Sequence, residues 1–137
     1  MDHLFSPNLS VREVNQLSAL ALAHCGDAVF ELLVRTWLCG CSEARPGKLH
    51  RATVARVCAP AQAARAERLL PLLSPEELAF YRRGRNAHVH QIPKNATHEQ
   101  YSRATGLESL FGALYLTGQL SRLEELFRLS MEDSDAL

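Results

Sequence analysis

The chain has 137 residues, of which 47% are apolar and 22% are charged. This length suits one compact domain, and the apolar fraction is too high for a disordered chain. Fifteen basic and fifteen acidic side chains give a formal net charge of zero. That balance argues against a protein that is basic throughout and binds nucleic acid by charge alone.

The charge is nevertheless distributed unevenly along the chain. Residues 1–44 carry two basic and five acidic groups, a charge of −3, and residues 104–137 carry two and six, a charge of −4. Residues 45–103 carry eleven basic and four acidic groups, a charge of +7. Thirteen of the fifteen basic residues are arginine, whose planar guanidinium suits bidentate contacts with phosphate. The middle of the chain could therefore attract a polyanion.

The cysteines and the chain termini indicate the cellular setting. The N-terminal residues lack the basic and apolar regions of a secretory signal, and no apolar run approaches the ~18–20 residues of a membrane span. We therefore expect a cytoplasmic protein with no membrane contact and with free thiols at Cys25, Cys39, Cys41 and Cys58. Cys39 and Cys41 could form half of a zinc site, but no second pair at ligand spacing follows them.

Apolar residues at helical spacing dominate the sequence. Gly40 ends the first helical run, Arg45, Pro46 and Gly47 predict a turn, and Ser74 followed by proline and two acids predicts a helix start. Residues 86–98 lack helical periodicity and predict a loop. The predicted helices cover approximately residues 17–38, 49–57, 60–70, 75–85, 99–117 and 120–131.

No strand-like alternation, internal repeat or low-complexity tract is present. The sequence therefore predicts an all-α fold with a single domain over residues 1–131. The acidic tail, residues 132–137, is expected to be frayed.

Two carboxylates stand in segments that are otherwise apolar. Asp27 and Glu108 each lie in a helical run where an unpaired charge would cost several kcal/mol if buried. Small residues, Gly26 and Gly106, stand close to them and would permit two helices to approach closely. If the helices cross there, the two acids converge and can hold a hard cation such as Mg²⁺ through oxygen ligands.

Other interpretations of these acids remain open at this stage. Asp27 and Glu108 could lie on a solvated stripe, or each could pair with Arg35 or Arg103. Glu31 lies one turn after Asp27 and would face the same side. Glu31 is interpreted as an acid that contacts the metal ligands, or as a surface residue, rather than as a direct metal ligand.

Within the basic middle of the chain, the arginine-rich segment at residues 82–86 and the polar residues that follow it could bind phosphates. A plain solvated charge run is the alternative, and a metal shared by His88 and His90 is disfavoured. His24 is expected to be a packed histidine rather than a catalytic base. The sequence does not decide whether His88, His90 and Lys94 touch phosphates or only shape their loop. The candidate residues for binding the phosphates of a nucleic acid are Arg82, Arg83, Arg85, Asn86, Lys94 and Asn95.

Two segments of the chain resemble ribonuclease III catalytic domains. Residues 20–31, Leu-Ala-Leu-Ala-His-Cys-Gly-Asp-Ala-Val-Phe-Glu, resemble their Leu-Gly-Asp-Ala-Val stretch. Residues 105–116, Thr-Gly-Leu-Glu-Ser-Leu-Phe-Gly-Ala-Leu-Tyr-Leu, resemble their second acidic helix. Further blocks at residues 49–52, 82–87 and 93–96 are similar to Mini-ribonuclease III, a family with the catalytic domain and no double-stranded-RNA-binding domain. The family's other two acids are replaced by Ala23 and Thr105, as in Mini-ribonuclease III.

The resemblance implies a homodimeric helical endonuclease that hydrolyses phosphodiesters of double-stranded RNA and leaves 5′-phosphates. It implies Asp27 and Glu108 as the catalytic residues and as ligands of Mg²⁺, with Mn²⁺ as a substitute. The cation would lower the pKa of a coordinated water and neutralise charge on the scissile phosphate. The resemblance further implies a substrate in precursor 23S ribosomal RNA and leaves room for an accessory ribosomal protein.

Two alternatives assign no catalysis to the chain. One is a helical RNA-binding or ribosome-assembly factor, which would bind RNA with or without Mg²⁺ and leave it intact. The other is an all-α interaction module whose acidic ends bind a basic partner, which would have no affinity for duplex RNA. Neither alternative needs acids inside apolar helices, so the endonuclease interpretation is preferred.

Overall fold

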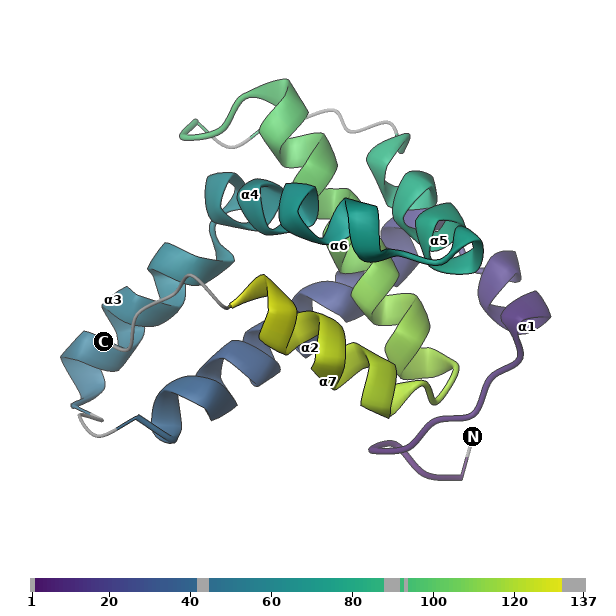
Figure 1. Ribbon diagram of the computed structural model, residues 1–137, viewed down its shortest axis with the longest axis horizontal. Coiled ribbons are helices and arrows are strands. Elements are labelled where there is room, and N and C mark those ends of the chain that lie inside the picture. The colour runs from purple at the N-terminus through teal and green to yellow at the C-terminus, as the bar shows by residue number, and fades with distance from the viewer. Residues whose placement is uncertain (1, 42–44, 88–91, 93, 132–137) are drawn as a thin grey trace.

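The computed structural model describes residues 2–41, 45–87, 92 and 94–131, and the predictions for His88, His90 and the tail at 132–137 lie outside this part. The described residues form helices and turns without a strand, as predicted (Figure 1). A single turn of 3₁₀-helix spans Leu70–Leu72. The α-helices are α1 (Val11–Gln16), α2 (Ala19–Cys39), α3 (Pro46–Val57), α4 (Ala59–Leu69), α5 (Pro75–Arg85), α6 (His98–Leu116) and α7 (Leu120–Ser130).

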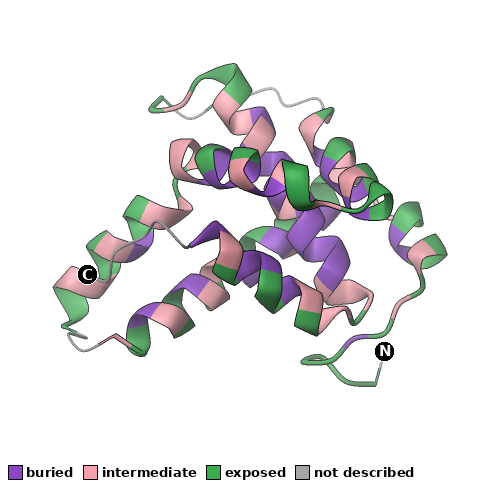
Figure 2. Ribbon diagram, in the orientation of Figure 1, coloured by how far each residue is buried: buried purple, intermediate pink, exposed green. Residues whose placement is uncertain are grey.

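Helix α6 is the centre of the fold. Eleven of its residues between Ser102 and Leu114 are buried, because α2, α4, α5 and α7 all pack against it (Figure 2). Phe30 of α2 lies edge-on to Phe111 of α6 and to Phe127 of α7, with ring centroids 5.5 and 5.9 Å apart. Helix α6 is apolar around most of its circumference, and the surrounding helices bury most of that circumference.

Helices α2 and α6 touch through their backbones where Gly26 meets Gly112. A Cβ atom at Gly26 would overlap the carbonyl oxygen of Glu108 and lie 2.8 Å from the amide nitrogen of Gly112. The close approach predicted at Gly26 is therefore present. Gly106 does not take part in it, because Gly106 faces the Tyr81 ring of α5 instead. Only a crossing without side chains brings α2 and α6 this close.

The helix starts and stops follow local chemistry. Ser74 caps α5, as predicted, and forms a capping box with Glu77. The turn predicted at residues 45–47 is wrong, because Pro46 is the first residue of α3. A proline lacks only an N–H that has no helical partner at that position. Gly118, with a φ of 75°, separates α6 from α7.

The short helix α1 was not predicted from the sequence, because six residues with one buried side chain, Val14, give no helical periodicity. It is held against α5 by Arg83, whose guanidinium donates to the carbonyl oxygens of Val14, at 3.3 Å, and of Leu17. Among the described residues, no helix has the length and apolar character required to cross a membrane.

Candidate active site

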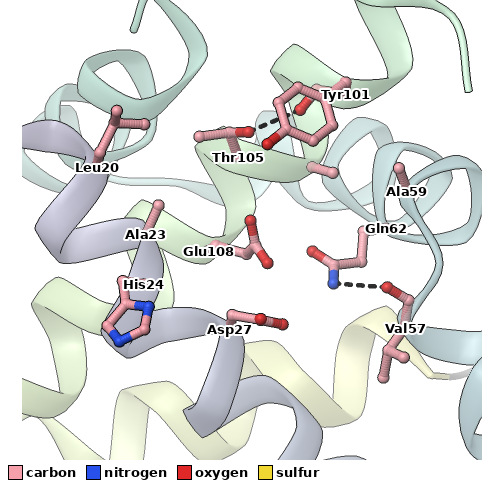
Figure 3. A pocket seen from close by; sticks show the side chains of 11 residues that line it. Leu20, Ala23, His24, Asp27, Val57, Ala59, Gln62, Tyr101, Thr105 and Glu108 are labelled. Carbon is pink, nitrogen blue, oxygen red and sulfur yellow. Dashed lines mark hydrogen bonds between the residues drawn. The ribbon is translucent and has the colours of Figure 1, made fainter. Parts of the chain in front are cut away.

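A pocket of about 390 Å³ opens where α2, α4 and α6 converge (Figure 3). Helices α2 and α6 form two of its walls, and the third comes from the junction of α3 and α4. Its volume leaves room for a hydrated cation beside a phosphate group. The polar side chains that line it are His24 and Asp27 from α2, Gln62 from α4, and Tyr101, Thr105 and Glu108 from α6.

The two predicted acids face each other in this pocket (Figure 3). Asp27 is exposed at its rim, whereas Glu108 is half-buried. The pKa of Glu108 is raised to about 8, first by burial and then by the facing Asp27, through its negative charge and through a hydrogen bond to the protonated Glu108. The Gln62 amide opposes this shift. At neutral pH without a cation, Glu108 therefore holds a proton, which a cation must displace.

The arginine pairings considered for these acids are not formed. Arg35 pairs with Glu31 at 3.0 Å, and Arg103 pairs with Glu99 at 2.8 Å and with Glu67. Glu31 is absent from the pocket lining, and 40% of its side chain is exposed. Its partner and exposure favour the surface interpretation of Glu31.

The oxygen atoms of the pocket suit a hard divalent cation. Carboxylate and amide oxygens are ligands of Mg²⁺ and Mn²⁺, which usually retain several waters as well. The part of the chain that the structure describes has no cluster of three or more His, Cys, Asp or Glu side chains suited to a metal. Asp27 and Glu108 can thus hold a cation whose remaining positions are filled by other oxygens.

The two positions where the family carries further acids also line the pocket. Ala23 contributes a methyl group, and the hydroxyl of Thr105 donates to the carbonyl oxygen of Tyr101 at 2.8 Å. His24, expected to be packed, is exposed beside them. Sequence analysis missed Gln62, although a polar residue on the buried, alanine-rich face of α4 was the available signal.

The six candidate RNA-binding residues do not form one group. Arg82 and Arg85 are three residues apart, so they share a face of α5, and Asn86 follows at its end. Arg82 and Asn86 are exposed, and Arg85 is half-buried. Arg83 points away from this face and binds α1, as described above, so the structure gives it a different partner.

The buried face of α5 packs directly on α6. A Cβ atom at Gly84 would lie 2.6 Å from the Cβ of Ser109, the residue that follows Glu108 in the sequence. Lys94 and Asn95 are exposed and come just before α6, whose first turns carry Tyr101 into the pocket. Basic and amide side chains therefore lie at the end of α5 and shortly before the start of α6.

Comparison with known proteins agrees with this geometry. A Mini-ribonuclease 3 from Enterococcus faecalis is 45% identical over 118 residues, which cover 85% of this chain and 89% of that protein. A Mini-ribonuclease 3 from a Thermoanaerobacter species is 41% identical over 133 residues, which cover 96% and 94%. A crystal structure of a Fusobacterium nucleatum protein superposes with a TM-score of 0.80 at 25% identity, over 88% of this chain and 96% of that one.

The family model of the ribonuclease III domain matches residues 20–119, a range that runs from the second residue of α2 to beyond the end of α6 and contains every side chain of the pocket. The match covers well over half of the chain, and the relatives align over most of their own length. The chain therefore belongs to the ribonuclease III family of endoribonucleases.

Proposed function

We propose that this chain cleaves double-stranded RNA with the help of Mg²⁺ held by Asp27 and Glu108. The observation that supports this most strongly is the position of the two carboxylates. They come from two helices, face one another in a pocket, and match the acids of the family's motifs. A non-catalytic RNA-binding factor would not require two facing acids, one of which holds a proton at neutral pH.

The side chains of the pocket have separable roles in this proposal. Asp27, exposed at the rim, is accessible to a cation, and Glu108 joins it after losing its proton. When bound, Mg²⁺ supplies activation of a water and neutralises charge developing on the scissile phosphate. Attack in line with the 3′-oxygen would leave a 5′-phosphate and a 3′-hydroxyl, and the open side of the pocket admits the phosphodiester.

RNA would be held by the exposed residues beside the pocket. Double-stranded RNA is recognised through its shape, phosphates and 2′-hydroxyls, which arginine, lysine and asparagine side chains can contact without reading bases. Arg82, Arg85 and Asn86 at the end of α5, together with Lys94 and Asn95, have the exposure and chemistry for this role. Arg83 is left out of the proposal because its guanidinium binds α1.

Replacing Arg82 and Arg85 with alanine is expected to weaken RNA binding and to flatten its salt dependence. Each lost phosphate contact lowers the slope of log K against log salt by roughly 0.9, so the double variant should lose up to about 2 from that slope. Fluorescence anisotropy with a labelled duplex at several salt concentrations measures it. Arg128→Ala, on the exposed surface of α7, is the control. A slope equal to that of the parent would show that Arg82 and Arg85 do not contact RNA phosphates and are solvated surface residues.

We also propose that the chain acts as a homodimer through α2. Leu20, His24, Ala28 and Leu32 follow one another at four-residue spacing and are all exposed, with Leu32 56% accessible. Leu20 and His24 also line the pocket, so a partner on this face would lie beside the active site. A two-fold dimer would supply one site for each RNA strand. Light scattering that gives the mass of one chain at micromolar concentration would exclude this arrangement.

The biological substrate is proposed to be a duplex in precursor 23S ribosomal RNA, as the resemblance implies, with a ribosomal protein as an accessory partner. A partner that presents the duplex would add to the affinity that the exposed arginine, lysine and asparagine side chains supply. The four cysteines are free in the structure, which suits a reducing compartment, and we propose the cytoplasm.

The direct test is incubation of the purified protein with end-labelled RNA in the presence of Mg²⁺ or of a chelator. We expect cleavage of duplex RNA with Mg²⁺ or Mn²⁺, none with chelator, and 5′-phosphate on the new ends. A duplex formed by the two ends of precursor 23S RNA should be cut faster than an unrelated duplex of equal length. Binding of both duplexes without cleavage would favour the ribosome-assembly factor, and no binding would favour the protein interaction module.

A further inference from the structure

The side chain of Gln62 carries a buried oxygen atom that has no hydrogen-bond partner. Gln62 is only 2% exposed, and it enters the pocket from α4, opposite Asp27 and Glu108 (Figure 3). Its Nε2 donates a hydrogen bond to the carbonyl oxygen of Val57 at 2.9 Å. Its Oε1 is buried and accepts no hydrogen bond from any described residue. Leaving such an acceptor unsatisfied costs about 1–3 kcal/mol, so its orientation requires a reason.

Val57 fixes that orientation. If the amide of Gln62 were turned over, its oxygen would face the carbonyl oxygen of Val57, and two acceptors would meet without a proton between them. The bond to Val57 therefore keeps Oε1 on the side of the pocket that faces Glu108 (Figure 3). A backbone carbonyl at the end of α3 thus determines which atom α4 presents to the acids.

No described side chain donates a hydrogen bond to this oxygen in the structure. Ala23 has no donor, and the hydroxyl hydrogen of Thr105 is used by the carbonyl of Tyr101. The groups that face Gln62 are the two carboxylates, which accept hydrogen bonds when ionised. Once Glu108 has lost its proton, three oxygen acceptors from three helices converge on one space, and a divalent cation suits such a set of ligands.

We propose that Gln62 supplies its Oε1 as the third protein oxygen of the divalent-cation site, alongside Asp27 and Glu108. This inference rests on the proposed function, because it takes the two acids as the cation's ligands. Gln62 is a neutral ligand, so it adds an oxygen without adding a third negative charge to a pair that already repel each other. The amide thereby compensates for the absence of a further carboxylate at Ala23 and Thr105.

The inference is tested by cation binding in the absence of RNA. Mn²⁺ alone is titrated into the protein, and the loss of the electron paramagnetic resonance signal of the free ion gives the dissociation constant. Gln62→Leu removes the oxygen at similar volume and should weaken Mn²⁺ binding about tenfold or more. Gln62→Glu keeps an oxygen at the same place, although its second oxygen then faces the carbonyl of Val57, and it should bind Mn²⁺ more tightly than Gln62→Leu. Gln16→Leu, at an exposed residue of α1, is the matched control and should bind as the parent does.

Thermal unfolding of the metal-free variants is recorded beside the titration, because Gln62→Leu also loses the bond to Val57. A folded Gln62→Leu protein that binds Mn²⁺ as tightly as the parent would overturn the inference, and so would a parent that binds no Mn²⁺. Weak binding by Gln62→Glu, as weak as that of Gln62→Leu, would overturn it as well. A parent that binds Mn²⁺ through Gln62 but leaves duplex RNA intact would refute the proposed function and leave the inference standing.

Discussion

Asp27→Asn and Glu108→Gln are each expected to reduce cleavage of duplex RNA by about a thousandfold or more, while the protein remains folded. Each variant removes one of the two carboxylates that face the pocket, and the loss of a charged metal ligand forfeits several kcal/mol of transition-state stabilisation. Glu108→Gln is the more informative of the two variants, because it should disturb the metal-free protein least. Because the pKa of Glu108 is raised to about 8, the carboxyl is already neutral at pH 7 without a cation, and the amide replaces a neutral group.

The measurement combines single-turnover cleavage with thermal unfolding at increasing Mg²⁺ concentration. The parent should become more stable as Mg²⁺ is added, and both variants should lose that response together with their activity. Glu31→Gln is the control, because Glu31 forms an exposed pair with Arg35 outside the pocket, and such pairs contribute little. We expect it to cleave within about twofold of the parent. Parental cleavage by folded Asp27→Asn and Glu108→Gln would refute the site assignment.

The second large effect is expected at Gly26, where Ala should lower the free energy of unfolding by about 3 kcal/mol or more. The added methyl would overlap the backbone carbonyl of Glu108, which cannot rotate away as a side chain can. Helices α2 and α6 would have to separate along their whole crossing. Since small domains have only roughly 5–15 kcal/mol of stability, this variant should unfold at much lower denaturant concentration. It should also lose activity, because the same contact sets the distance between Asp27 and Glu108.

Gly47→Ala is the matched control for this prediction. It makes the same chemical change inside the first turn of α3, where the nearest atom to an added Cβ is the flexible end of Arg51 at 3.9 Å. Its stability should change by less than about 1 kcal/mol, towards higher stability, because alanine loses less backbone entropy in a helix. Equilibrium unfolding in urea measures both variants. Equal midpoints for Gly26→Ala and Gly47→Ala would show that the crossing tolerates a side chain and would contradict the steric argument.

The sequence predicted the long helices well because their signals are local and repeated. The apolar period from Leu17 to Leu38 corresponds to α2, and the serine and proline at 74–75 mark the start of α5. The turn expected at residues 45–47 failed because proline and glycine are found both in turns and in the first turn of a helix. The short helix α1 was missed although Ser10 and Glu13 form a capping box at its start, and its contact with Arg83, far away in the sequence, follows no local pattern.

The two acids of the candidate site could also be predicted from local signals, whereas its third polar residue could not. Asp27 and Glu108 interrupt apolar helices, so their chemistry is visible without a structure. Their pairing depended on a glycine crossing, which the sequence indicated at Gly26. Gln62 was missed because its role depends on which way its amide turns, and the carbonyl of Val57 decides that. Arg83 was included because its neighbours Arg82 and Arg85 suggested one cluster, whereas consecutive helical residues point in different directions.

The glycine crossing of α2 and α6 also has a consequence for how the protein folds. Asp27 and Glu108 are 81 residues apart in the sequence, and Gln62 lies between them on a third helix. A single helix has mostly local contacts, but no single helix can bring these oxygens together until that long loop has closed. The candidate active site therefore forms only with the tertiary structure, and a nascent chain lacks it until residues beyond α6 have left the ribosome.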